Sequence, residues 1–260
     1  MTWVVAASTI FGYGALYSDV QVTFESGATK DLLQKAYPVG NSIAAGFAGS
    51  VKIGCRLVES LITTLSTRDH EAAWHPVAAA LRWAPVARAI FGASEVEERA
   101  LQSRFLLVGA SPTESCGLGA RIYFVRFASP EFEPQVMRRA TKICSIGSGS
   151  GVAEYKHSIK PLLRHTSGIL QAEVGRPGGW GNMLGHSISL MLGRNPRSGI
   201  SRNLHTILVG REGFMYGKTD QVVHHDGQRI EHRMPTVAQS YGDFLALASA
   251  AGHEAACAQC

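Results

Sequence analysis

The order in which strand-like and helix-like segments follow one another constrains the fold of this chain most. Segments rich in β-branched and aromatic residues come first, followed by apolar helical segments, further strands, further helices and a last strand pair. A parallel doubly wound sheet requires a regular alternation of strands and helices, which this order lacks. The order fits an α+β fold in four layers, with two antiparallel sheets packed face to face and helices outside.

Each expected element carries a clear composition signal. Strand segments end at Gly, Pro or Ser turns, and helical segments carry apolar residues three or four positions apart. The expected strands cover 2–8, 13–23, 41–49, 103–110, 120–128, 140–150 and a hairpin at 204–217. The expected helices cover 50–66, 71–91, 151–165 and 180–195. Pro76 and Pro85 predict that the second of these helices is kinked or split.

The chain becomes more polar after about residue 219. Residues 222–234 are typical of a hairpin around Asp226-Gly227, and residues 237–252 are typical of a short helix. This part resembles an appendage more than a second domain. We therefore expect one domain over 1–218 and a C-terminal extension over 219–260.

The composition excludes several classes of function. Apolar residues make up 45% and charged residues 17% of 260 residues, which predicts extensive burial, in the core or against copies of the same chain. The net charge is +5, but the basic residues are scattered, which argues against a nucleic-acid partner. Without a run of eighteen apolar residues or a signal-like N-terminus, we expect no membrane association and a cytoplasmic location.

The five cysteines suggest free thiols rather than a disulfide framework. Their number is odd and their spacing matches no framework. Cys257 and Cys260 form one C-x-x-C pair, but a zinc site needs a second pair. We expect no metal and no cofactor, and an unpacked end of the chain at these two cysteines.

Thr2 follows Met1 directly and opens an apolar strand, which raises a chemical hypothesis. An N-terminal threonine supplies its hydroxyl as a nucleophile and its own α-amine as the base. That amine exists only after Met1 is removed, and threonine is small enough for ordinary methionine removal. Such a site also needs a lysine that lowers the pKa of the amine, an aspartate that fixes the lysine, and a backbone N–H for the oxyanion.

Residues of these types follow Thr2 in order. Asp19 lies in "SDVQVT", Lys35 in "KAYPV", Gly46 in "IAAGFAGSV" and Ser148 in "IGSGS". The four motifs, in this order behind the threonine, resemble the proteasome β-subunit and HslV-like family of N-terminal-nucleophile threonine hydrolases. The likeness is close over residues 2–65 and looser over about 140–217. It indicates a divergent bacterial branch of that family.

The resemblance implies a fold and a role for each motif residue. The fold is the helix–sheet–sheet–helix sandwich of N-terminal-nucleophile hydrolases. Thr2 would be the nucleophile and base, Asp19 and Lys35 a charged pair beside it, and Gly46 the oxyanion donor. Ser148 would form hydrogen bonds near the amine. Ala44 and Ala48 would line a roomy specificity pocket.

The sequence departs from the family in three places. A late family element is an aspartate three residues before Ser-Gly; here Asn195 precedes Ser198-Gly199, keeping the hydrogen bonds but losing the charge. Ser198 would complete the catalytic network. The region of about 70–138 and the extension after 218 have no family counterpart. We expect the first to be an insertion.

Each motif also has a plain structural explanation. Thr2 can be an ordinary strand residue, Asp19 a turn residue and Gly46 a glycine needed for close packing, and Lys30 competes with Lys35. The "GSGSG" segment resembles a phosphate loop but lacks its Lys-Ser/Thr ending. His224, His225, Asp226 and His232 suggest a metal site, but a solvated hairpin is the better interpretation.

Three functions remain open. The first is a threonine endopeptidase subunit in a homo-oligomeric ring, a hexamer or heptamer stacked in pairs, which takes polypeptide substrates and an ATP-dependent unfoldase partner. The second is a hydrolase of small amides. The third is a catalytically inactive assembling scaffold.

Overall fold

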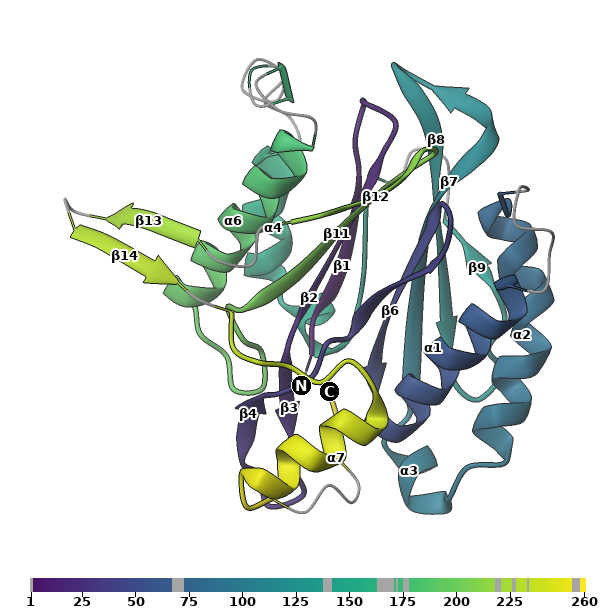
Figure 1. Cartoon of the computed structure of the whole chain (residues 1–260), viewed down its shortest axis with the longest axis vertical. Helices are drawn as coiled ribbons and strands as arrows, with labels where there is room; N and C mark the ends of the chain where they lie inside the picture. The colour runs from purple at the N-terminus through teal and green to yellow at the C-terminus, as the bar shows by residue number, and fades with distance from the viewer. Residues whose placement is uncertain are drawn as a thin grey trace.

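The computed structural model describes residues 2–66, 73–137, 142–162, 171, 173–174, 178–217, 221–225, 228–232, 234–253 and 258–260. Two antiparallel five-stranded sheets form its centre (Figure 1). The first sheet has the order β10 (Ile143–Ile146), β1 (Val4–Ser8), β2 (Gly14–Asp19), β11 (Leu204–Gly210) and β12 (Gly213–Tyr216). The second has the order β5 (Ala36–Gly40), β6 (Ile43–Gly49), β7 (Ser103–Cys116), β8 (Gly119–Ala128) and β9 (Gln135–Val136).

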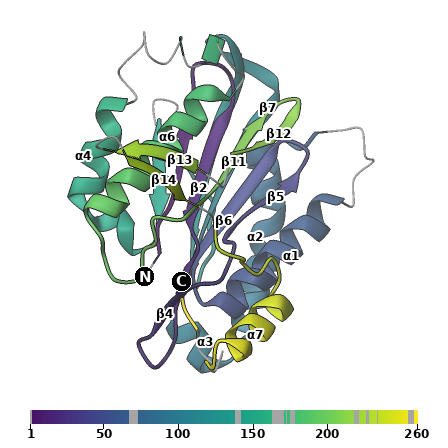
Figure 2. The same ribbon diagram turned by 60° about the vertical axis from the view of Figure 1, so that its left-hand side comes forward.

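Helices cover the outer face of each sheet. The first sheet is covered by α4 (Ala153–Leu162) and α6 (Gly179–Arg194), and the second by α1 (Val51–Ser66) and α2 (Pro76–Gly92) (Figures 1 and 2). Three buried apolar clusters separate these layers, one under each pair of helices and one between the sheets. The predicted α+β sandwich in the order helix, sheet, sheet, helix is therefore confirmed.

The apolar run of β1 follows from burial on both faces. Val5 and Ala7 face the helix layer of the first sheet, whereas Val4 and Ala6 face the second sheet. Because successive strand residues point to opposite faces, a strand between two apolar layers needs apolar residues at every position. The same rule explains β6, where Ile43 faces the helices.

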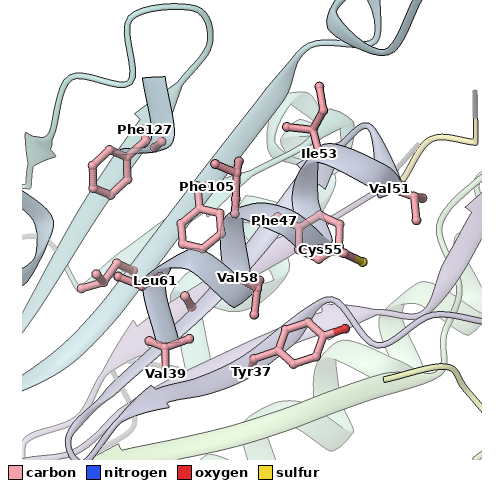
Figure 3. Close-up of a cluster of buried hydrophobic side chains, with 14 of the residues drawn as sticks. Tyr37, Val39, Phe47, Val51, Ile53, Cys55, Val58, Leu61, Phe105 and Phe127 are labelled. Atoms are coloured by element: carbon pink, nitrogen blue, oxygen red, sulfur yellow. The ribbon is translucent and has the colours of Figure 1, made fainter. Parts of the chain in front are cut away.

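The cluster under α1 and α2 is built from aromatic and branched side chains (Figure 3). Phe47 on β6 packs so closely against α1 that a Cβ at Gly54 would lie 2.1 Å from its ring. Trp83 of α2 lies 4.7 Å from Phe105, measured between ring centroids. Of the expected kink or split at Pro76 and Pro85, the split at Pro85 does not occur, since α2 begins at Pro76 and runs unbroken to Gly92. Packing of its Trp83 face outweighs the hydrogen bond that Pro85 cannot make.

The region of about 70–138, expected to be an insertion, lies within these layers. It contributes α2, β7, β8 and β9, together with the short helix α3 (Val96–Ala100). A two-stranded sheet of β3 (Gln21–Thr23) and β4 (Thr29–Asp31) projects beyond the end of β2. No helix in the described ranges is long and apolar enough to cross a membrane.

The C-terminal extension contains the expected hairpin and helix. The hairpin pairs β13 (Gln221–His225) with β14 (Gln228–His232), and α7 (Tyr241–Ala250) follows. Phe244 of α7 stacks on Phe24 with ring centroids 6.2 Å apart, which joins the extension to the cluster under α1. The expectation of an unpacked chain end is wrong for 258–260, because Ala258 and Cys260 are buried.

His205 on β11 gives the fold a pH-dependent stability. Burial lowers its pKa from 6.5 to about 4. Between these values the unfolded chain binds a proton that the folded chain does not, so stability falls as pH drops from 6.5 to 4. We expect this loss to reach up to about 3 kcal/mol and to shrink in His205→Gln, measured by urea unfolding at several pH values. An unchanged pH profile in the variant would contradict this role of His205.

Candidate active site

Thr2 lies two residues before β1 and is almost fully buried. Its backbone nitrogen donates to Ser148 Oγ at 3.0 Å, and Lys35 Nζ donates to its hydroxyl oxygen, Oγ1, at 2.8 Å. Because Oγ1 accepts from Lys35, its own proton remains available to a base. Met1 lies outside the described residues.

Asp19 and Lys35 form a buried ion pair next to Thr2. Asp19 ends β2 and Lys35 directly precedes β5, so the pair joins the two sheets. Lys35 Nζ lies 2.8 Å from Asp19 Oδ1, and both side chains are fully inaccessible to solvent. The ammonium also donates to the Gln21 carbonyl, so its three protons meet three acceptors, as a buried ammonium requires. Lys30, the competing lysine, is exposed on β4.

The Asp19 carboxylate is held by further donors. The Trp3 N–H donates to Oδ2 at 2.7 Å and the Gln21 N–H donates to Oδ1 at 2.9 Å. Burial raises the pKa of Asp19, and the Lys35 ammonium and these two N–H groups act in the opposite direction. Asp19 therefore fixes the position of Lys35, whose ammonium faces Thr2 Oγ1.

The turn before α4 brings Ser148 to Thr2. Gly147 has φ of 85°, and a Cβ there would lie 2.3 Å from the Thr2 carbonyl oxygen. Glycine is therefore required for the short 3-10 helix η1 (Ser148–Gly151) to approach β1. The Gly149 N–H donates to the Thr2 carbonyl at 3.2 Å. The turn positions Thr2 through both of its backbone groups.

Gly46, the predicted oxyanion donor, and the predicted pocket residues Ala44 and Ala48 all lie on β6. Gly46 is in register with Ala36 and Leu106, which places its backbone within the sheet ladders. A Cβ at Gly46 would lie 2.8 Å from Val4 Cγ1, so the two sheets need a glycine there for close packing. Ala44 and Ala48 belong to the cluster between the sheets.

Asn195 and Ser198 lie between α6 and β11. Asn195 ends α6, and its carbonyl accepts from the Tyr155 hydroxyl at 3.2 Å. Ser198 is exposed in the turn that the Arg197–Ile200 bridge closes. Within the part of the chain that the structure describes, neither residue forms a hydrogen bond to Thr2, Asp19 or Lys35. The structure thus brings together Thr2, Asp19, Lys35 and Ser148, and not Ser198.

Gly49 at the end of β6 was not singled out from the sequence. Its φ is 113°, and a Cβ would lie 2.2 Å from the Gln102 carbonyl oxygen, so only glycine fits. Its N–H donates to the Cys260 carbonyl oxygen at 2.6 Å. The signal was a glycine immediately before Ser50, whose Oγ accepts from the Ile53 N–H at 3.1 Å at the start of α1.

The structure does not test the metal site suggested by His224, His225, Asp226 and His232. Asp226 lies outside the described residues, as do the side chains of His224, His225 and His232. Across the side chains that are described, no group of three or more His, Cys, Asp or Glu residues could hold a metal ion.

No known family profile and no curated protein matches this chain. Among solved structures it is similar to the crystal structure of eukaryotic HslV from Trypanosoma brucei, with a TM-score of 0.51. The similarity covers 80% of this chain and 99% of that HslV chain, at 15% sequence identity. The likeness shows that the two chains share one layered fold, with two packed antiparallel sheets between helices.

Breaking the buried ion pair should lower the free energy of unfolding far more than breaking an exposed pair does. We expect Lys35→Met to lower the free energy of unfolding by about 3–5 kcal/mol, because Asp19 loses its counter-charge while it stays buried. The control is Lys52→Met, which breaks the exposed 2.9 Å pair with Glu95 and should change stability by less than about 1 kcal/mol. Equal losses in urea unfolding would contradict this difference.

Proposed function

We propose that this chain is an N-terminal threonine peptidase subunit that hydrolyses peptide bonds by acyl transfer through Thr2 after Met1 is removed. The observation that carries the proposal is the 2.8 Å contact between Lys35 Nζ and Thr2 Oγ1, inside a buried pair with Asp19. A buried ammonium aimed at a hydroxyl is an arrangement that activates a nucleophile. The HslV-like fold and the order of the motifs support the same conclusion.

The proposed reaction has two steps. Thr2 Oγ1 attacks the amide carbonyl, and the α-amine of Thr2 takes the hydroxyl proton. The C–N bond breaks, the amine passes that proton to the leaving nitrogen, and an ester to Thr2 remains. Water then hydrolyses the ester and regenerates the hydroxyl.

We assign the oxyanion donor to Gly49 rather than Gly46. The Gly49 N–H already holds a carbonyl oxygen, that of Cys260, whereas Gly46 lies inside the β6 ladders. A preorganised N–H that binds a carbonyl oxygen is suited to the oxyanion of a tetrahedral intermediate. Ser148, which contacts the Thr2 nitrogen, would orient the amine.

The assembly belongs to the same proposal and rests on the family resemblance. We propose a homo-oligomeric ring, a hexamer or heptamer stacked in pairs, with the Thr2 sites inside and an ATP-dependent unfoldase as partner. Polypeptide substrates are favoured over small amides because the Gly49 N–H, the assigned oxyanion donor, already binds the main chain of residues 258–260. Native mass spectrometry tests the ring, and a monomer or dimer would favour the small-amide hydrolase instead.

The decisive test is the chemistry of Thr2. We expect the mass of the purified protein to show removal of Met1, and Thr2→Ala to reduce peptide hydrolysis at least about a hundredfold. Thr2→Ser retains a hydroxyl and an amine, so it should keep measurable activity. The assay uses fluorogenic peptides and unfolded casein.

Two outcomes would contradict this mechanism. One is full retention of Met1 on the assembled, active protein, since the base would then not exist. The other is equal hydrolysis by Thr2→Ala and the wild-type protein. Absence of any hydrolysis by a protein that forms the ring would favour the inactive scaffold.

A further inference from the structure

The segment Ala258–Cys260 lies between β3 and the start of α1 and forms backbone hydrogen bonds to both sides. On one side, Gln259 and Thr23 exchange two backbone hydrogen bonds, of 2.8 and 3.0 Å. On the other side, Gly49 and Cys260 exchange two more, of 2.6 and 2.8 Å, and the Val51 N–H donates to the Ala258 carbonyl at 3.1 Å. Five main-chain hydrogen bonds therefore hold three residues, from both sides at once.

The side chains of this segment alternate between the protein and solvent. Ala258 and Cys260 are buried in the cluster under α1, and Gln259 between them is exposed. This period of two is that of a strand added to a sheet, in which main-chain pairing supplies affinity and alternate pockets supply selectivity. The segment is therefore held as extended main chain, through features that other peptides share.

The segment ends against the candidate active site. The N-terminal end of the chain, which leads into β1, and its C-terminal end lie side by side in both views (Figures 1 and 2). The Cys260 carbonyl oxygen accepts from Gly49, the N–H assigned above to the oxyanion. The charges of Lys35 and Asp19 influence the pKa of the Cys260 thiol, which burial raises to about 11.

We propose that Ala258–Cys260 is a tethered peptide ligand of the Thr2 site, which blocks the site until a substrate displaces it. The proposal rests on the proposed function, because it takes Thr2 as the nucleophile. The segment occupies the position of the substrate residues that precede the cleaved bond, and Cys260 stands for the residue directly before that bond. Because the segment is part of the same chain, it competes with substrate at a high effective concentration.

The position of Cys260 also defines a class of substrate. Its side chain shares a buried cluster with Tyr37 and Cys55, and it affects the pKa of both of these groups. A charged side chain in that apolar site would be desolvated without a partner. We infer that the enzyme prefers extended polypeptides with a small, uncharged residue before the cut bond.

The first experiment measures whether the segment is seated, without any need for catalysis. Every protein carries Cys257→Ser, so that Cys260 is the one thiol in the tryptic peptide after Arg233. Gln259→Pro removes the N–H that donates to Thr23, whereas the matched control Gln259→Ala keeps it. The rate of iodoacetamide labelling of Cys260 is measured by mass spectrometry at pH 8, relative to the exposed Cys116.

We expect Gln259→Pro to raise the Cys260 labelling rate at least tenfold, because release both exposes the thiol and returns its pKa toward the usual value. Gln259→Ala should label as slowly as the unchanged segment. Continued protection of the buried Cys55 in both variants verifies folding. Labelling of Cys260 in the unchanged segment as fast as Cys116 would overturn the proposal.

The second experiment measures the block itself with fluorogenic peptides. The chain without 258–260 should show a kcat/KM at least tenfold higher than the full chain, through a lower KM with kcat unchanged, because block and substrate exclude each other. Gln259→Pro should move in the same direction, and Gln259→Ala should not. Equal kcat/KM in the full and shortened chains would overturn the block.

The two proposals fail in different ways. If no form hydrolyses peptides but Cys260 is protected and released by Gln259→Pro, the acyl-transfer function fails and the seated segment stands. If hydrolysis depends on Thr2 while Cys260 labels freely, the function stands and the tethered ligand fails. Repeating the labelling in Thr2→Ala removes any contribution of turnover.

Discussion

The buried contact between Lys35 and its three acceptors is the interaction on which the site depends. Its ammonium joins the start of β1 through Thr2, the end of β2 through Asp19 and β3 through Gln21. Removal of two charges from water costs more than their attraction commonly returns, so such a pair is a poor means of stabilising a fold. Its presence at the junction of the two sheets is better explained by chemistry than by stability.

This junction is possible because the sheets approach closely next to it. Small residues occupy the facing positions of β1, β5 and β6, among them Ala6, Ala36 and Gly46. Close approach lets a lysine that precedes the second sheet reach a threonine that begins the first. Gly46 thus contributes to the site through packing, which was the plainer of its two interpretations from sequence.

Much of the fold could be predicted because its signals are local. The apolar alternation of β1, the helical spacing of α1 and the turn residues between strands each lie within a few positions of one another. Thr2, Asp19, Lys35 and Ser148 were found because motifs carry them in a fixed order. A split of α2 at Pro85, one of the two expected effects, does not occur, since tertiary packing of Trp83 overrides a local rule.

Gly49 and the segment 258–260 were missed for a different reason. The φ of 113° at Gly49 and its close approach to Gln102 are tertiary features, and the local signal, a glycine directly before Ser50, does not reveal them. The pairing of Gln259 with Thr23 links residues more than two hundred positions apart, so no periodicity predicts it.

The segment has a physical reason to be where it is. β3 pairs with the short β4 on one side, and the edge of a sheet offers its main-chain groups to any other strand. In this structure the main-chain groups of Thr23 and Gly49 both pair with the segment 258–260, Thr23 with Gln259 and Gly49 with Cys260. Pairing from both sides holds a peptide mainly through its main chain, which every polypeptide shares. The property that would admit many polypeptides to Thr2 is therefore the one that lets the chain's own segment occupy the same place.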